Sequence, residues 1–466
     1  MPIDTVHAFA TIRELGRRLR ARQFTSVDLT RLFLDRLEKH GKALNAVVTI
    51  TGEIALRQAQ QADDDLAAGR DRGPLHGIPY GAKDLLATVG APTTWGAPPL
   101  ADQRFDEDAT VVARLREAGA VLVAKLAMVE LAGGLGYEQA DAALTGPGLN
   151  PWNPKHWAGG SSSGSGAAVG AGLVPFAIGS ETSGSIVTPA AYCGVSGLRP
   201  TYGRVSRHGA MALTWSFDRL GPMARSADCC GLVLAAIAGY DPLDLSTSER
   251  DYKYDAKSDS ERFKLAVVAN SADGIQPEVA ENFAKSLEFL RERAEITEVQ
   301  TPDLPYGAVV GTIIDCEAAA VFEPLLDDGR VWKMRAPEDR IGLHVEQFIS
   351  AKDYINAQRI RRVIAREMDK LLAPFDAIVM PGRSSVAPPI DRTFGEYSRA
   401  WKHPTMGTAE NAAGVPSLTL PNGFGPHKLP TSIHFATRAF DENRLLRLGR
   451  YLQNKTDWHQ RRPPLG

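Results

Sequence analysis

The chain has 466 residues, of which 44% are hydrophobic and 23% charged. This composition is typical of a globular protein and excludes a disordered or fibrous one. Its 53 Lys and Arg residues against 55 Asp and Glu leave a formal net charge of −2, so charge indicates neither nucleic acid nor an anionic membrane surface as a partner. The length allows about three domains of typical size or one large α/β domain.

Cysteine spacing and hydropathy indicate where the protein acts. The four cysteines form no Cys-x-x-Cys pair, and the longest apolar stretch, 118–135, is interrupted by Lys125 and Glu130. The first residues lack a basic segment followed by an apolar run. We therefore expect no signal peptide and no membrane-spanning helix, and a cytoplasmic protein with reduced thiols.

In chain order, the predicted elements begin with helices over residues 1–70. Thr25 and Asp28 form a capping-box pair ahead of an apolar helical face, and Gly41 ends that helix. From residue 78 the pattern alternates between strands and helices. Strands are predicted at 78–82, 120–124, 173–178, 265–268, 377–380, 417–420 and 432–436, and helices at 110–118, 277–293, 351–372 and 442–452. This alternation predicts an α/β fold.

Two clusters of glycine and serine, at 159–166 and 179–185, interrupt this pattern. Because an apolar strand candidate lies between them, we interpret the region as a folded site and not as a flexible linker. The first cluster contains Gly-x-Ser-x-Gly, which would make Ser162 the nucleophile of an α/β-hydrolase elbow. That elbow requires a buried strand immediately before it, whereas residues 150–158 include two prolines and have the pattern of a loop. We therefore favour another arrangement.

Lys83 closes the predicted strand 78–82, and Ser161 and Ser185 lie in the two clusters. A poorly solvated lysine has a lowered pKa and can accept a proton. A serine needs such a base to become a nucleophile, and a second hydroxyl can relay the proton. Backbone N–H groups in a tight Gly/Ser turn can form an oxyanion hole. Each feature alone also fits a surface lysine or an ordinary turn.

Residues 159–201 (GGSSSGSGAAVGAGLVPFAIGSETSGSIVTPAAYCGVSGLRPT) resemble the amidase signature of the Ser-cisSer-Lys amidohydrolases, and residues 77–85 (GIPYGAKDL) resemble the lysine segment of that family. The resemblance covers most of the chain and is weakest over 241–400. It implies a central mixed β-sheet covered by helices on both faces. It also implies a single domain made of N-terminal helices (1–70), a signature core (71–240), a variable substrate-side region (241–400) and a C-terminal return to the core (401–466).

The resemblance implies a role for each motif residue. Ser185 would be the nucleophile that forms the acyl-enzyme, Lys83 the base, and Ser161 the bridging hydroxyl, held by a cis peptide bond after Gly160. The oxyanion hole would consist of the backbone N–H groups of Thr182, Ser183, Gly184 and Ser185. Ser162 and Ser163 would be supporting hydrogen-bonders. We expect no metal and no cofactor, and we assign no substrate-binding residue.

One departure from the family pattern concerns the substrate. Val187 stands where many members, including the A subunits of glutamine-dependent tRNA amidotransferases, carry an arginine. We therefore expect a stand-alone amidase that cleaves a small neutral carboxamide, unless another arginine substitutes from elsewhere. The alternatives are a glutaminase-type A subunit, which needs a partner protein, and a catalytically silent scaffold. A homodimer stays open, and we expect neither nucleic acid nor membrane as a partner.

Overall fold

The computed structural model describes residues 4–133, 137–256, 262–402 and 406–465. Within these residues eleven strands form one mixed sheet in the order β1-β3-β2-β4-β6-β5-β10-β11-β9-β7-β8. The strands are β1 (Val47–Ile50), β2 (Pro79–Lys83), β3 (Val121–Leu126), β4 (Phe176–Glu181), β5 (Ser196–Arg199), β6 (Arg219–Ala224), β7 (Phe263–Val268), β8 (Ala294–Val299), β9 (Ala377–Pro381), β10 (Ser417–Phe424) and β11 (Pro430–Ala436). β2 pairs in parallel with β3 and β4, and β7 with β8 and β9. The predicted α/β class and mixed sheet are confirmed.

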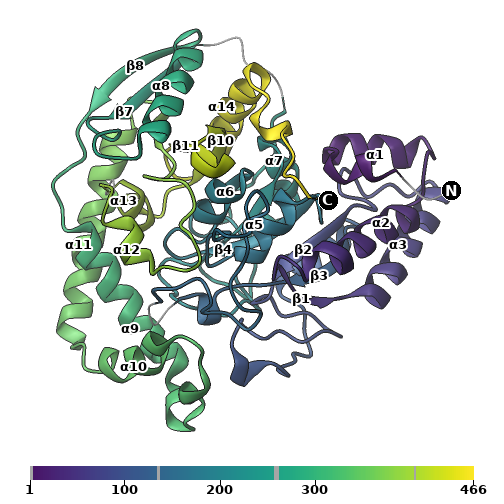
Figure 1. The fold of residues 1–466 in the computed structure, drawn as a ribbon, viewed down its shortest axis with the longest axis horizontal. Helices are drawn as coiled ribbons and strands as arrows, with labels where there is room; N and C mark the ends of the chain where they lie inside the picture. The colour runs from purple at the N-terminus through teal and green to yellow at the C-terminus, as the bar shows by residue number, and fades with distance from the viewer. Residues whose placement is uncertain (1–3, 134–136, 257–261, 403–405, 466) are drawn as a thin grey trace.

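Helices pack around this sheet. They are α1 (Ile12–Arg20), α2 (Ser26–Arg36), α3 (Gly52–Ala67), α4 (Thr110–Glu117), α5 (Ser163–Gly170), α6 (Val187–Cys193), α7 (Ala227–Ile237), α8 (Pro277–Arg291), α9 (Tyr306–Asp327), α10 (Pro337–Glu346), α11 (Ala351–Leu372), α12 (Phe394–Ser398), α13 (Met406–Ala413) and α14 (Glu442–Lys455). Figure 1 shows α1–α3 beside β1–β3 at one end and α9–α11 at the other. No helix of the described ranges is long and apolar enough to cross a membrane.

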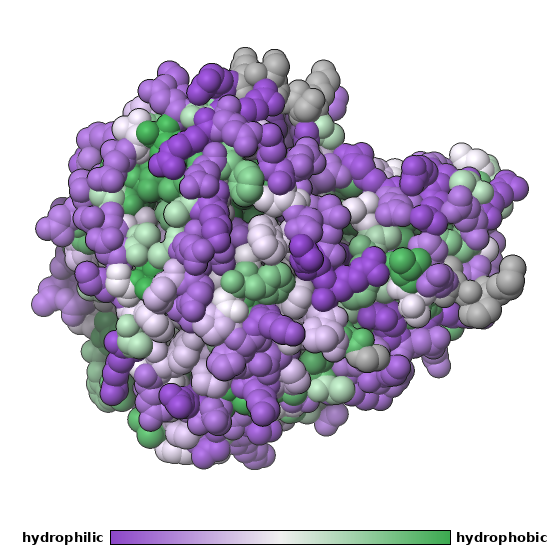
Figure 2. Space-filling view, turned by 45° about the horizontal axis from the view of Figure 1, so that its top comes forward, coloured by the Kyte–Doolittle hydropathy of each residue, from purple (hydrophilic) through white to green (hydrophobic). Residues whose placement is uncertain are grey.

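Both faces of the sheet are covered in its centre. Successive residues of β4 point to opposite faces: Phe176 and Ile178 belong to one buried cluster, and Ala177 belongs to another. A strand buried on both faces has a continuous apolar sequence, which β4 has in its first three residues. Figure 2 shows one outer face of the molecule, on which hydrophilic side chains predominate and apolar ones form small scattered groups.

The structure corrects several predicted boundaries. The capping box of Thr25 and Asp28 is present, and the helix predicted at 351–372 is α11. The strand predicted at 173–178 begins instead at Phe176, because Gly172 turns the chain with φ +64° and Pro175 has no N–H for the ladder. The elements that were not predicted are the strands β1, β5, β6 and β8 and the helices α5, α6, α7, α9, α10, α12 and α13.

Candidate active site

The parallel pairing of β2 with β4 determines where the predicted site residues meet. Tyr80 to Ala82 of β2 pair with Phe176 to Ile178 of β4, so the carboxyl ends of both strands lie at the same edge. Lys83 ends β2, and Ser180 is the penultimate residue of β4. Lys83 Nζ lies 2.9 Å from Ser180 Oγ as a result.

Lys83 is buried without a carboxylate partner. Its Nζ lies 2.7 Å from Ser161 Oγ, and no ion pair to it occurs within the described ranges. Lys125, also fully buried, pairs instead with Asp84 at 2.9 Å. Burial lowers the pKa of Lys83 to about 7, against the opposing pull of the Asp218 and Glu181 carboxylates. An amine with this pKa is partly neutral near pH 7 and has a free lone pair to accept a proton.

Ser161 reaches Lys83 from the turn that precedes α5. The Gly160–Ser161 peptide bond is cis, as the resemblance implied. The carbonyl of Ser161 accepts a hydrogen bond of 3.1 Å from the N–H of Val129, which ties the turn to the segment after β3. The Oγ of Ser162 bonds to both backbone groups of Ser180, and the Oγ of Ser163 donates to the carbonyl of Ala127.

Ser162 therefore connects the backbones of two segments and is not exposed on an elbow. The segment before it, 150–158, contains only isolated bridge residues and no strand, which rules out the elbow geometry. Ser162 and Ser163 both make hydrogen bonds to backbone, as a supporting role would require.

Ser185 lies in the turn that joins β4 to α6. Its carbonyl accepts a hydrogen bond of 3.3 Å from the N–H of Ser162, so the structure brings the backbones of the two predicted serine segments together. Ser185 is 9% exposed, whereas Ser161 is fully buried. Ser185 can therefore meet a ligand, whereas Ser161 is buried next to the amine.

Glu181 fixes the shape of this turn from inside. Its Oε2 accepts hydrogen bonds from the N–H groups of Ile186 (2.8 Å) and Val187 (3.0 Å) at the start of α6, and its Oε1 pairs with Arg199 at 2.8 Å. Burial raises the pKa of Glu181, but the guanidiniums of Arg199 and Arg219 and these hydrogen bonds outweigh burial and hold it at about 2. The carboxylate is thus charged and ties both ends of the turn.

The turn also presents unpaired backbone donors. Within the described residues, no protein acceptor lies against the N–H groups of Thr182, Ser183, Gly184 or Ser185. Gly184 has φ +98°, a conformation open to glycine and strained for other residues. Unpaired N–H groups on a fixed turn are what an oxyanion hole requires.

A cavity of about 380 Å³ opens onto this turn. Thr182, Ser183 and Ser185 line it, together with Gly160. Its apolar walls come from aromatic side chains, namely Tyr137, Trp157, Tyr192, Phe394 and Tyr397. The cavity thus joins a wide aromatic space to the predicted nucleophile.

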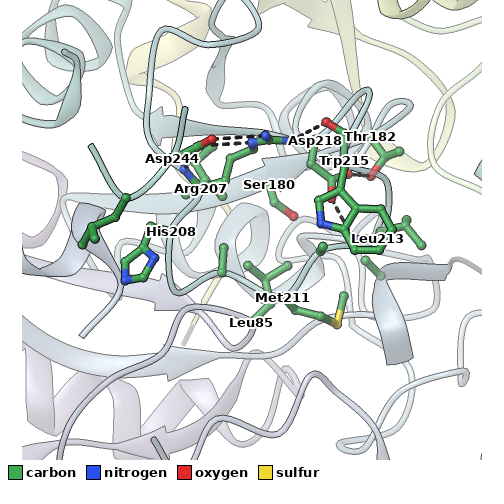
Figure 3. Close-up of a pocket in the computed structure, with 15 residues that line it drawn as sticks. Leu85, Ser180, Thr182, Arg207, His208, Met211, Leu213, Trp215, Asp218 and Asp244 are labelled. Atoms are coloured by element: carbon green, nitrogen blue, oxygen red, sulfur yellow. Dashed lines mark hydrogen bonds and ion pairs between the residues drawn. The ribbon is translucent and has the colours of Figure 1, made fainter. Parts of the chain in front are cut away.

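A second cavity of about 200 Å³ borders the same strand end. Figure 3 shows Ser180 in its wall, between the Arg207–Asp244 ion pair and the hydrogen bond of Asp218 with Thr182. Asp218 Oδ1 accepts that bond at 2.5 Å. Burial raises the pKa of Asp218, although the bonds from Thr182 and from backbone N–H groups oppose the rise. Asp218 thereby anchors the first residue of the turn.

Sequence reasoning missed three residues of this site: Ser180, Glu181 and Asp218. Ser180 was accessible in principle, because a parallel strand beside β2 would place its end next to Lys83. Asp218 comes from a distant segment and gave no local signal. No group of three or more metal-ligating side chains occurs in the part of the chain that the structure describes.

A family model described as Amidase matches residues 28–446. The chain belongs to this family, whose members are α/β enzymes that hydrolyse carbon–nitrogen bonds. It is 37% identical to the A subunit of glutamyl-tRNA(Gln) amidotransferase from Roseiflexus sp. (strain RS-1), over 98% of each chain.

Solved structures extend the comparison. The chain superposes on native peptide amidase from Stenotrophomonas maltophilia with a TM-score of 0.87, at 30% identity over 99% of each chain. It superposes on the A subunit of glutamyl-tRNA(Gln) amidotransferase from Thermotoga maritima with a TM-score of 0.80, at 27% identity over 98% of this chain and 97% of that one. The predicted amidase-signature fold is confirmed.

Proposed function

We propose that this chain cleaves the C–N bond of a carboxamide through an acyl-enzyme on Ser185. The observation that carries the proposal is the buried amine of Lys83, 2.7 Å from Ser161 Oγ and without a carboxylate partner among the described residues. A lysine held in this way acts as a base and not as a structural charge.

The proposed reaction is a proton relay from Ser185 through Ser161 to Lys83. Neutral Lys83 accepts the proton of Ser161, Ser161 accepts the proton of Ser185, and Ser185 Oγ attacks the substrate carbonyl carbon. The carbonyl oxygen becomes an anion and accepts hydrogen bonds from the N–H groups of the turn, each worth about 3–4 kcal/mol of barrier. The relayed proton leaves with ammonia or an amine, and water then hydrolyses the acyl-enzyme by the same route.

Two settings for this chemistry differ in substrate and partner. The curated relatives, named as amidotransferase A subunits, support a glutaminase component that works with a partner protein. These relatives favour the glutaminase setting over the stand-alone amidase. The stand-alone setting is supported by Val187, which replaces the expected arginine, and by the superposition on peptide amidase.

We also propose that the chain is one domain and acts in the cytoplasm. The continuous sheet from β1 to β8 supports the first proposal. The second is supported by the four cysteines, all of which are free thiols.

The test is amide turnover by the purified chain, with and without the amidotransferase partner proteins from the same organism. We expect ammonia release that disappears in Ser185→Ala. Glutamine hydrolysis that requires the partner would assign the amidotransferase setting, and turnover of other amides without a partner would assign the stand-alone one. Full activity in Ser185→Ala, or no amide hydrolysis under any of these conditions, would contradict the proposal, and the latter would favour a silent scaffold.

A further inference from the structure

Arg383 brings a guanidinium to the nucleophile turn from a distant part of the chain. It follows β9 in the loop after Pro381, and its Nη2 donates to Oγ1 of Thr188 in the first turn of α6. A Cβ on Gly184 would lie 3.1 Å from this Nη2. The guanidinium therefore lies beside the residue that precedes Ser185.

Among the described residues, Arg383 has no carboxylate as an ion-pair partner. Arg199 and Arg383 line one cavity, but Arg199 is paired with Glu181 at 2.8 Å and with Glu410 at 2.9 Å. Within the described residues no carboxylate forms an ion pair with Arg383, although its side chain is half-buried. Partial burial weakens hydration of a cation, so a ligand anion at this point gains more than it would at an open surface.

The cavity beside Arg383 has a volume of about 260 Å³ and is lined by Ser183 and Gly184, the two residues before Ser185. It shares Ser183 with the larger aromatic cavity, and Thr188 lines the latter next to Ser185. Its other hydrogen-bonding side chains include Ser384, Thr408 and Asn411, and its described lining contains no Asp or Glu. A ligand with its carbonyl at Ser185 can thus extend a polar group past Ser183 toward a cation.

We propose that Arg383 binds a carboxylate carried by the acyl part of the substrate, so that the enzyme prefers acidic amides to neutral amides of the same shape. The proposal rests on the proposed function, since it places the scissile carbonyl at Ser185. A planar guanidinium recognises a carboxylate through two parallel N–H···O bonds. Arg383 thereby supplies the cation that Val187 does not, and the expectation of a neutral substrate is replaced by that of an anionic one.

The test compares matched amides in matched variants. Succinamate carries a carboxylate at the position where 4-methylpentanamide carries an isopropyl group of similar shape. We expect wild type to favour succinamate, and Arg383→Gln to lower the ratio of the two kcat/KM values by about 10- to 100-fold, mainly through KM for succinamate. Arg383→Lys should keep part of the preference for succinamate, because lysine supplies the positive charge without the planar pair of N–H donors. Arg392→Gln, at an exposed position outside the cavities, should keep the wild-type ratio.

Two further measurements separate the ways in which the test can fail. Labelling of Ser185 by a fluorophosphonate reports the nucleophile independently of any amide. If Ser185 is labelled in wild type and Arg383→Gln but the ratio does not change, or if wild type lacks the acidic preference, the Arg383 proposal is overturned alone. If Ser185 is not labelled and neither amide is hydrolysed, the proposed function itself fails. Succinate should inhibit wild type competitively and Arg383→Gln at least about tenfold more weakly.

Discussion

The proposed chemistry depends on one side chain, the amine of Lys83, which is buried without a counter-ion among the residues that the structure describes. Two buried lysines lie on neighbouring strands, yet Lys125 pairs with Asp84 whereas the described partners of Lys83 are the hydroxyls of Ser161 and Ser180. An ion pair stabilises the charged form of a lysine, and burial alone stabilises the neutral form. This difference in partners is the reason why we propose Lys83, and not Lys125, as the base.

The pH dependence of catalysis should report the pKa of Lys83. Burial lowers this pKa from 10.5 to about 7, and only the neutral amine accepts a proton. The kcat/KM for a neutral amide should therefore be constant above about pH 8 and fall about tenfold per pH unit below 7. A steady-state profile between pH 5 and 9 measures this. A profile that stays flat down to pH 5 would show that Lys83 is not the base.

Local sequence revealed some of the site residues and not others. Lys83, Ser161 and Ser185 lie in motifs whose order and spacing could be read without the structure. Glu181 lies within the same motif, but its function depends on Arg199 and on the first N–H groups of α6, which only the folded chain brings to it. No sequence motif marks Arg383, because its place beside the turn depends on the pairing of β9 with β11.

At the scale of elements, the turn between β4 and α6 is held by a buried carboxylate. In Glu181→Gln the amide has one acceptor oxygen, so either Arg199 or the N–H groups of α6 lose their partner. We expect the free energy of unfolding to fall by about 3–5 kcal/mol and kcat to fall by about 10- to 100-fold. Denaturant unfolding and steady-state kinetics measure the two effects.

Glu410→Gln is the matched control for this variant. Glu410 is an equally buried partner of Arg199, at 2.9 Å, but it bonds to His434 and not to the turn. Its loss should destabilise the fold to a similar extent and lower kcat much less. Equal losses of kcat in both variants would mean that Glu181 acts only through the ion pair and not by shaping the turn.

Helix α5 shows why a glycine-rich tract can fold as a helix. Its glycines and serines have low helix propensity, so sequence alone predicted no helix there. Every residue of α5 is buried, and a Cβ on Gly164 would lie 2.3 Å from the carbonyl oxygen of Ala46 and 2.4 Å from the nitrogen of Ala127. Close packing against other backbone selects glycine and outweighs propensity.

Substitution of Gly164 tests this account of α5. Gly→Ala in a helix normally stabilises a protein by about 0.5–1 kcal/mol. Gly164→Ala should instead destabilise it by about 1–3 kcal/mol or more, because the added methyl overlaps fixed backbone. Gly311→Ala in α9, where nothing lies within 4 Å of the new Cβ, should show the normal gain. Thermal unfolding of both variants measures these changes in stability. An increase in stability in Gly164→Ala would contradict the packing argument.

At the scale of the whole molecule, the sheet order brings together segments that are far apart in the chain. β4 lies between β2 and β6, so one edge combines Lys83 from β2, the turn after β4, and Asp218 immediately before β6. Alternating patterns predicted the α/β class and most of the long elements. They could not predict the antiparallel insertion of β6 and β5, because short strands leave a weak periodic signal and partner choice depends on distant segments.

The central claim, that Lys83 activates Ser185 through Ser161, is tested most directly by mass spectrometry of the chain after reaction with a fluorophosphonate. The account predicts one adduct, on the peptide that contains Ser185, forming in wild type and at least about 100-fold more slowly in Lys83→Met and Ser161→Ala. An adduct on a different serine, or a Ser185 adduct that forms equally fast without the lysine, would contradict it.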